Sequence, residues 1–380
     1  MIDTVILAVS QGNLTARDVD TKGRPMWDGG TRGKGYETFY RDPSKEERGS
    51  EHYFPQITGV NNMSKKHGVT SRIKIQFSVP KLLYGNNVDE VVDADFDVVL
   101  SVLQSRLSMM GIDLTAKEIR NAKIMRVDYS KNVLLGKRAP ITGVMKELEK
   151  LMVRRGVDVS YTHYRNGGQG LKATASQHSF TFYDKVAELS KKTGRGKKWQ
   201  QAQTRLAARL RGQNILRFEV QLTARVKLNA VFARHGFGMN PAFSDVFSSQ
   251  KSQTILRDYW DAATLNWRGV IFGPKRSAKH VLYKVLATHP AKAAEAIELV
   301  GLIMLARNCG GMRELRIVLD AFVNARTWSR FARKFNTTAP RLRGMRADEW
   351  FKKMTASLKS YQPFYVTSRR GYGVKLKKTQ

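Results

Sequence analysis

Three short segments of the chain combine an apolar face with side chains that can do chemistry: Ile124–Tyr129, Phe180–Lys185 and Leu216–Leu222. Side chains alternate along a β-strand, so residues two apart share a face. The polar faces carry Arg126 and Asp128 on the first segment, Thr181, Tyr183 and Lys185 on the second, and Arg217, Glu219 and Gln221 on the third. If the three strands lie in one sheet with these faces together, two carboxylates, a tyrosine and several cations converge.

Such a group of residues predicts metal-assisted attack of a tyrosine on a phosphodiester. Asp128 and Glu219 offer the oxygen ligands that Mg²⁺ or Mn²⁺ prefers. Tyr183 is the candidate covalent nucleophile, and Lys185 is the neighbouring cation that favours its phenolate form. Each residue also has an ordinary interpretation, because Arg-x-Asp and Arg-x-Glu pairs are common ion pairs on strands and a single strand tyrosine usually packs.

The net charge indicates a polyanionic partner. The chain has 380 residues, with 66 Lys and Arg against 32 Asp and Glu, and a formal net charge of +34. Nucleic acid is the usual partner of so basic a protein. A ribosomal-type or non-specific basic protein is the alternative, but 42% of the residues are hydrophobic, which is enough for a real core and about two domains.

Basic residues cluster where no acid interrupts them, and we predict that these residues contact DNA. Between Glu188 and Glu219 the candidates are Lys191, Lys192, Arg195, Lys197, Lys198, Arg205, Arg209 and Arg217, and Arg126 is a further candidate outside this stretch. A second basic stretch follows Glu349 and alternates with aromatic residues from Trp350 to Tyr372. Cations for phosphates and rings for bases suit contact with single-stranded DNA; a solvated basic face with a disordered tail is the alternative.

The hydrophobic pattern predicts an α+β protein. Strands alternate with helices up to about residue 235, and after residue 250 only helical patterns remain. We therefore expect an antiparallel sheet with packed helices in a catalytic domain over residues 1–240. A mostly α-helical domain over residues 241–380, ending in a basic tail, is expected to add DNA binding.

Several other chemistries lack their residues. The single cysteine, Cys309, excludes a disulfide framework and a cysteine-based zinc site and is typical of a reducing cytoplasm. The seven histidines are scattered, so a two-histidine metal site on one strand is not available. No phosphate-binding loop of an ATP-driven motor occurs, and no apolar stretch is long enough to cross a membrane.

The sequence resembles the filamentous-phage replication initiators, the family of gene-two replication proteins. The matching stretches are Met1–Val5, Ser78–Asn87, Arg126–Asp128, Phe182–Leu189 and Leu216–Leu222. The last three also resemble the core motifs of rolling-circle plasmid initiators. The order and spacing of the stretches are specific together, although each is weak alone.

This resemblance implies a function. Such proteins bind a double-stranded origin, nick one strand, remain attached to its 5′ phosphate through tyrosine, and later close the displaced single strand into a circle. It implies Tyr183 as nucleophile and Asp128 and Glu219 as metal ligands. Tyr164, beside a glycine-rich turn, is an alternative nucleophile or a second acceptor for closure. The implied partners are a host helicase, a host polymerase and a phage single-strand-binding protein, in the cytoplasm of a bacterial host.

Two rival functions remain at this stage. A non-catalytic origin- or operator-binding regulator would keep the fold, but Asp128, Glu219 and Tyr183 would not converge. A tyrosine recombinase would use a tyrosine near the end of the chain, such as Tyr361 or Tyr365, although no matching Arg and His pattern precedes these. The segment 324–333 faintly resembles a helix-turn-helix reader in which Arg330 contacts DNA; an ordinary basic surface helix is the alternative.

Overall fold

The computed structural model describes most of the chain. The described residues are 1–10, 15–16, 29–33, 36–45, 47, 50, 52–64, 68–136, 139–149, 157–190, 197–264, 277–288, 293–309, 311–320, 322–338 and 349–366. Within this part of the chain, no helix has the length and apolar character needed to span a bilayer.

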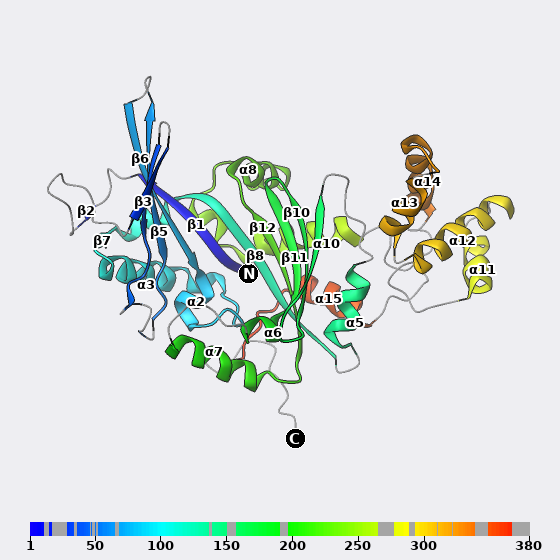
Figure 1. Ribbon diagram of the computed structural model, residues 1–380, viewed down its shortest axis with the longest axis horizontal. Helices are drawn as coiled ribbons and strands as arrows, with labels where there is room; N and C mark the ends of the chain where they lie inside the picture. The colour runs from blue at the N-terminus through cyan, green and yellow to red at the C-terminus, as the bar shows by residue number, and fades with distance from the viewer. Residues whose placement is uncertain are drawn as a thin grey trace.

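A ten-stranded sheet forms the body of the molecule (Figure 1). Its strand order is β3-β4-β5-β6-β1-β8-β12-β11-β10-β9, and all neighbouring strands are antiparallel. The strands are β1 Ile2–Ser10, β3 Gly29–Gly33, β4 Tyr36–Arg41, β5 Gln56–Ser64, β6 Gly68–Ser78, β8 Lys123–Leu135, β9 Asp158–His163, β10 Gln169–Ala175, β11 His178–Asp184 and β12 Asn214–Leu222. The short strands β2 (Thr15–Ala16) and β7 (Ile112–Asp113) pair separately. The α+β class and the antiparallel sheet predicted from the sequence are confirmed.

Helices surround the sheet and continue beyond it. They are α2 Val79–Tyr84, η2 Asp93–Asp95, α3 Phe96–Met109, α4 Ala116–Arg120, α5 Ile141–Leu148, α6 Lys185–Leu189, α7 Lys197–Arg209, α8 Arg225–Arg234, α9 Phe243–Val246, α10 Ser249–Thr264, α11 Ala278–Thr288, α12 Ala293–Asn308, α13 Met312–Asp320, α14 Ala325–Thr338 and α15 Glu349–Ser360. Local signals set several ends. Pro80 lies in the first turn of α2, where its missing N–H costs nothing, and Gly85 ends that helix with a φ of 67°.

Alternation gives the central strands one buried face and one polar face. In β1, Val5 is fully buried and lies between Phe77 of β6 and Val127 of β8, while the residues on either side of Val5 are partly exposed. Paired residues of antiparallel strands project to the same side, so the apolar residues of neighbouring strands add up to one continuous core layer. The polar residues are left on the opposite face.

Helices α10 and α15 cover the apolar face and correct the predicted domain boundary. The Trp260 ring of α10 lies 6.0 Å from Phe182 and 6.3 Å from Phe218, and Phe351 of α15 lies 5.0 Å from Trp260, all as centroid distances. These contacts join residues after position 240 to the sheet's own core. The sequence placed the boundary where the strand pattern ends, but among the described helices after position 240 only α11–α14 stand apart from the sheet (Figure 1).

The aromatic residues of the C-terminal stretch are part of the core. Trp350, Phe351, Tyr361 and Phe364 are all less than 10% exposed. The backbone of Phe364 exchanges hydrogen bonds with Glu90, which fixes this segment against the loop that follows α2. Base stacking on these four rings is therefore wrong as a prediction. The end of the basic tail, residues 367–380, lies outside the described residues.

Candidate active site

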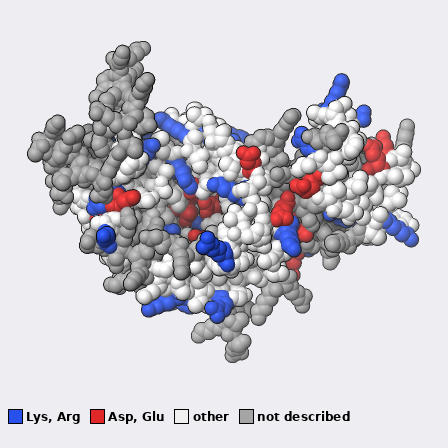
Figure 2. Space-filling model, in the orientation of Figure 1, with Lys and Arg blue, Asp and Glu red and all other residues white. Residues whose placement is uncertain are grey.

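The register brings the three polar faces together in the middle of the sheet. Strands β8, β12 and β11 are neighbours, and Gln221 lies opposite Asp128, while Tyr183 lies opposite Arg217. Glu219 occupies the position between Gln221 and Arg217 on the same face. Figure 2 shows acidic side chains gathered near the middle of the view, with Lys and Arg side chains around them.

A continuous chain of hydrogen bonds joins the two carboxylates to the tyrosine. The Tyr183 hydroxyl donates to Glu219 Oε2 at 3.2 Å. The Gln221 amide nitrogen donates to Glu219 Oε1 at 2.8 Å and reaches Asp128 Oδ2 at 3.4 Å. Ser179 donates to the Gln221 carbonyl at 3.0 Å, which fixes the amide in this orientation. One partly buried network thus links Asp128, Glu219 and Tyr183, which the sequence singled out.

Arg126 holds both oxygens of Asp128. Its Nε donates to Oδ1 at 2.8 Å and its Nη2 to Oδ2 at 2.6 Å. The Asp128 side chain is only 2% exposed, whereas that of Arg126 is 27% exposed. Burial raises the pKa of Asp128 to about 7, opposed by the Arg126 hydrogen bonds and reinforced by the charge of Glu219. The guanidinium of Arg126 therefore binds Asp128, while part of the side chain stays exposed to solvent.

Tyr183 sits at the end of its strand. Burial raises its pKa well above the usual value, Arg217 opposes this shift, and Glu219 adds to it. The next residue, Asp184, caps α6 by accepting the Ala187 N–H at 3.0 Å. The net shift keeps the phenol protonated, although Arg217 already favours the phenolate.

Lys185 is the first residue of α6 and not part of the strand, which differs from the predicted shared face with Tyr183. It is nevertheless a neighbour of Tyr183, because its Nζ lies 5.6 Å from the Tyr183 ring centroid. The side chain is fully buried and pairs with Glu188 at 2.8 Å. Burial lowers the pKa of Lys185 to about 8, although Glu188 opposes the shift.

Arg217 does not fit the predicted role in DNA contact. It is 1% exposed, and its Nη2 lies 2.8 Å from Asp3 Oδ1 while its Nε lies 3.5 Å from Glu219 Oε2. Its Nη1 donates to the carbonyl of Asn87 at 2.7 Å. All parts of the guanidinium thus face interior partners, so Arg217 neutralises the carboxylates of the site from within.

Asp3 is the member of this site that the sequence interpretation missed. Strict alternation places Asp3 on the core face with Val5, but the β1–β8 register shifts between Ile2 and Thr4. This β-bulge brings the Asp3 carboxylate to Arg217, on the polar side. Burial alone would raise the pKa of Asp3, yet Arg217 and Lys185 hold it below its usual range. The available signal was a carboxylate inside an apolar run.

Tyr164 lies beside Tyr183, which fits its role as the alternative nucleophile. Its ring packs over a glycine-rich turn: a Cβ built on Gly170 would lie 2.7 Å from the Tyr164 hydroxyl and 3.6 Å from Tyr183 Cβ. Gly170 pairs with Tyr183 across β10 and β11, so the two tyrosines share one end of the polar face. Burial raises the pKa of Tyr164 to about 12, with further contributions from Glu188, Asp184 and Glu219.

The two carboxylates suit a hard cation whose remaining coordination positions are filled by water and by the substrate. The Gln221 amide nitrogen, a donor of positive polarity, already bridges Glu219 and Asp128 at the place where a cation would neutralise both. Within the described part of the chain, no group of three or more His, Cys, Asp or Glu residues is arranged to hold a metal ion. Mg²⁺ commonly binds through one or two carboxylates together with water and substrate phosphates, and the pair fits that arrangement.

The predicted basic cluster is only partly described. Lys191, Lys192 and Arg195 lie outside the described residues, and for Lys197 and Lys198 only the helical backbone is described. Arg205 and Arg209 are exposed on α7, which packs through Leu206 and Ala207. These two arginines remain available to a polyanion.

The C-terminal candidates differ in exposure. Arg330 is exposed on α14, with its guanidinium 5.9 Å from the Phe331 ring centroid. Tyr361, a nucleophile in the recombinase alternative, is buried and hydrogen-bonded to Ser252. A phenol that is buried and bonded in this way is not accessible to DNA, so Tyr361 gives that alternative no support.

Comparisons with known proteins agree with the resemblance in the sequence. The family described as the N-terminal part of a replication-associated protein, the phage gene-two product, matches residues 1–235. No curated protein matches the chain. Among solved structures, the di-domain ARO/CYC BexL from the BE-7585A biosynthetic pathway is similar over 70% of this chain and 96% of that chain, at 10% identity and a TM-score of 0.18, which carries no argument.

Proposed function

This chain belongs to the family of the phage replication-associated gene-two protein, through that protein's N-terminal region, and from that premise we propose that it is a rolling-circle replication initiator. It nicks one strand of a double-stranded origin through Tyr183 and later rejoins the displaced strand as a circle. The observation that carries the proposal is the hydrogen-bonded line from Tyr183 through Glu219 and Gln221 to Asp128. A regulator without catalytic activity has no need for this convergence.

In the nicking step, Tyr183 Oη attacks the scissile phosphorus. The new bond is the phosphotyrosine ester, the broken bond is the one between phosphorus and the 3′ oxygen, and that oxygen leaves as a 3′-hydroxyl after taking a proton from solvent. Glu219 is placed to accept the phenolic proton, because it already accepts the Tyr183 hydrogen bond. Lys185 and Arg217 supply the positive charge that favours the phenolate.

Asp128 and Glu219 are the proposed ligands of Mg²⁺ or Mn²⁺. When bound, such an ion polarises the scissile phosphate and stabilises the charge that develops on it. Arg126 competes with the ion for Asp128, because its two hydrogen bonds occupy one lone pair on each oxygen of that carboxylate. The partial exposure of Arg126 provides an alternative partner for it, a DNA phosphate at the site entrance.

Tyr164 is the proposed second acceptor for strand closure. Closure requires a second transesterification, in which a 3′-hydroxyl attacks the phosphotyrosine and the tyrosine leaves. A neighbouring tyrosine on the same face can capture the newly made 5′ end while the first is released, and Tyr164 is the tyrosine beside Tyr183. Tyr183 is assigned the first step because of its bond to Glu219.

Double-stranded origin DNA and the displaced single strand are the proposed nucleic acid partners, and the net charge of +34 supports both. The family resemblance supports the proposal of a host helicase, a host polymerase and a phage single-strand-binding protein as partners, and of the bacterial cytoplasm as the location.

A covalent-adduct assay tests the proposal. The protein is incubated with Mg²⁺ or Mn²⁺ and a supercoiled plasmid that carries the origin of the replicon encoding it. Wild type is expected to give nicked circles with covalently attached protein. Tyr183→Phe removes only the hydroxyl, so it is expected to abolish the adduct while leaving DNA binding within about twofold.

Tyr164→Phe is the matched control for Tyr183→Phe. We expect it to keep the first nick and the adduct but to lower the yield of closed single-stranded circles. An adduct that persists in Tyr183→Phe and disappears in Tyr164→Phe would reverse the assignment. Binding without nicking in the wild type, with either metal, would support the non-catalytic regulator instead.

A further inference from the structure

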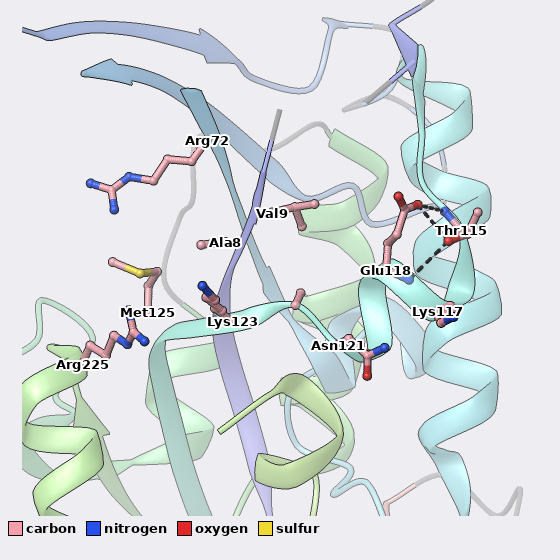
Figure 3. Close-up of a pocket in the computed structure, with 11 residues that line it drawn as sticks. Ala8, Val9, Arg72, Thr115, Lys117, Glu118, Asn121, Lys123, Met125 and Arg225 are labelled. Carbon is pink, nitrogen blue, oxygen red and sulfur yellow. Dashed lines mark hydrogen bonds between the residues drawn. The ribbon is translucent and has the colours of Figure 1, made fainter. Parts of the chain in front are cut away.

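A groove of about 710 Å³ opens beside the start of β8 (Figure 3), and its lining does not include Tyr183. It is lined by Ala8, Val9, Arg72, Thr115, Lys117, Glu118, Asn121, Ala122, Lys123, Met125 and Arg225. Figure 3 shows the side chains of Arg72, Lys123 and Arg225 on one side of β1 and the Thr115–Glu118 turn on the other. None of the described lining residues is aromatic.

A β-bulge places Lys123 on the same face as the candidate active site. Lys123 is three residues before Arg126, so strict alternation would put the two on opposite faces. The β1–β8 register shifts between Ile6 and Leu7, so that Arg126 lies opposite Ile6 and Lys123 opposite Ala8. Since Ile6 and Ala8 share a face of β1, Lys123 is returned to the polar side.

The groove carries positive charge without internal compensation. Arg72, Lys117 and Lys123 are exposed, and none of them pairs with a carboxylate among the residues that the structure describes. The acid in the lining, Glu118, is engaged elsewhere: its Oε2 accepts hydrogen bonds from the Thr115 N–H and hydroxyl, both at 2.8 Å. The cations on the opposite side of β1 therefore remain available to an anion.

Arg225 is held in place by a strained residue. Its Nε and Nη2 donate to Asn240 Oδ1 at 3.1 and 2.8 Å, and Asn229 also donates to that oxygen, at 2.9 Å. Asn240 has a φ of 54°, a left-handed conformation that a non-glycine residue adopts at a cost in free energy. This clamp, the pair of hydrogen bonds from Arg225 to Asn240, uses Nε and Nη2 of the guanidinium and does not involve Nη1.

From the groove, the register and the clamp we infer that Arg72, Lys123 and Arg225 bind the phosphate backbone of duplex DNA flanking the cleaved position. Lys123 is five positions before Asp128 on β8, which is roughly 17 Å of strand. A duplex rises about 3.4 Å per nucleotide, so the bound phosphates lie about five nucleotides from the scissile one. Single-stranded sites stack bases on aromatic rings, and the described residues of this lining include none, which favours duplex.

The position relative to the nick rests on the proposed function, whereas the binding of duplex at this groove does not. The test is therefore a binding measurement in the absence of metal. Fluorescence anisotropy of the full chain with a duplex of about 30 base pairs, and with the single strand of the same sequence, is recorded between about 0.05 and 0.3 M salt. The variant is Lys123→Gln with Arg225→Gln, and the control is Lys146→Gln with Lys279→Gln, both exposed and outside the groove lining.

Each lost phosphate contact lowers the salt slope for duplex by about 0.9, which is about a fivefold loss of affinity at about 0.15 M salt. We expect the double variant to bind duplex about 25-fold more weakly, with the slope reduced by about 2. Its affinity for single strand and the duplex affinity of the control are expected to stay within about threefold of wild type.

Equal losses in the variant and the control, an unchanged salt slope, or a loss confined to single strand would each overturn the inference. Ethylation interference then locates the contact. Modification of phosphates about five nucleotides from the nick is expected to weaken wild type and to leave the double variant unaffected. If the protein never nicks DNA but the duplex affinity falls as expected, the proposed function fails and the groove stands.

Discussion

Two groups of cations lie on the same face of the sheet, and they differ in their burial and in the partners of their charges. Around the candidate active site, Arg217 and Lys185 are fully buried and each faces a carboxylate at 2.8 Å. In the groove, Arg72 and Lys123 are exposed and pair with no carboxylate in the described part of the chain. The buried group is committed to its own acids, whereas the exposed group is free for a partner.

This difference shows that burial decides what a basic residue can do in this protein. A charge taken out of water is stable only with a paired partner, so a buried cation that released its acid for DNA would leave two desolvated charges. An exposed cation keeps its water and its counterions until a polyanion releases them. Arg126 stands between the two groups, with 27% of its side chain exposed and both bonds on Asp128.

The largest effect that tests the comparison is on stability. Arg217→Met keeps most of the side-chain volume but leaves Asp3 and Glu219 without their cation, which we expect to lower the free energy of unfolding by about 3–5 kcal/mol. The same change at exposed Lys123 is expected to stay within about 0.5 kcal/mol. Urea unfolding followed by circular dichroism measures both.

A double variant checks the cause. If the loss comes from unpaired buried charge, Asp3→Asn is expected to recover part of it in the Arg217→Met background, although Asp3→Asn alone destabilises the protein. Similar small losses for Arg217→Met and Lys123→Met would remove the distinction between the two groups.

Much of the fold could be predicted from the sequence, because the hydrophobic pattern of the central strands is periodic. The strands around Asp128, Tyr183 and Glu219 all alternate, and their order in the sheet placed the polar faces together as expected. The domain boundary failed, because helical spacing reports which side of α10 and α15 is apolar but not which layer that side covers. Trp260 packs on the sheet, and no local sequence pattern predicts this contact.

The site was predictable where alternation is regular and not where it is interrupted. The two bulges in the pairing of β1 with β8 decide the places of Asp3 and Lys123, and a bulge leaves no mark in the residues on either side of it. The burial of Arg217 was hidden for a related reason: the carbonyl of Asn87 and the carboxylate of Asp3 come from segments remote in the sequence.

The pH dependence of stability tests the buried group with a smaller effect. Although burial alone would raise it, Lys185 holds the pKa of Glu188 at about 2. A depressed carboxyl pKa stabilises the folded state above the unfolded value of about 4.5, and this stability is lost as the pH falls from there towards 2. Glu188→Gln is expected to cost about 1–2 kcal/mol at pH 7, since the side chain is partly exposed.

The difference in unfolding free energy between wild type and Glu188→Gln should shrink as the pH falls. Unfolding midpoints in urea are measured from about pH 7 to about pH 3, with Glu295→Gln as the comparison, because Glu295 is an exposed carboxylate on α12. A gap that stays constant over this range would mean that the Lys185–Glu188 pair is not the source of the difference.

The smallest effect concerns the clamp on Arg225 and sharpens the exposed side of the comparison. Asn240→Gly removes the amide that holds Arg225, while glycine accepts the φ of 54° without strain. The unfolding free energy is therefore expected to change by less than about 1 kcal/mol. Ordering one long side chain costs about 0.5 kcal/mol or more, so duplex affinity should fall about two- to threefold.

Asn240→Ala loses the same amide and keeps the strain, so it should bind duplex like Asn240→Gly but be less stable by about 1–2 kcal/mol. Duplex affinity that is unchanged in both variants would show that Arg225 reaches the phosphates without its clamp, and the groove would then act through charge alone.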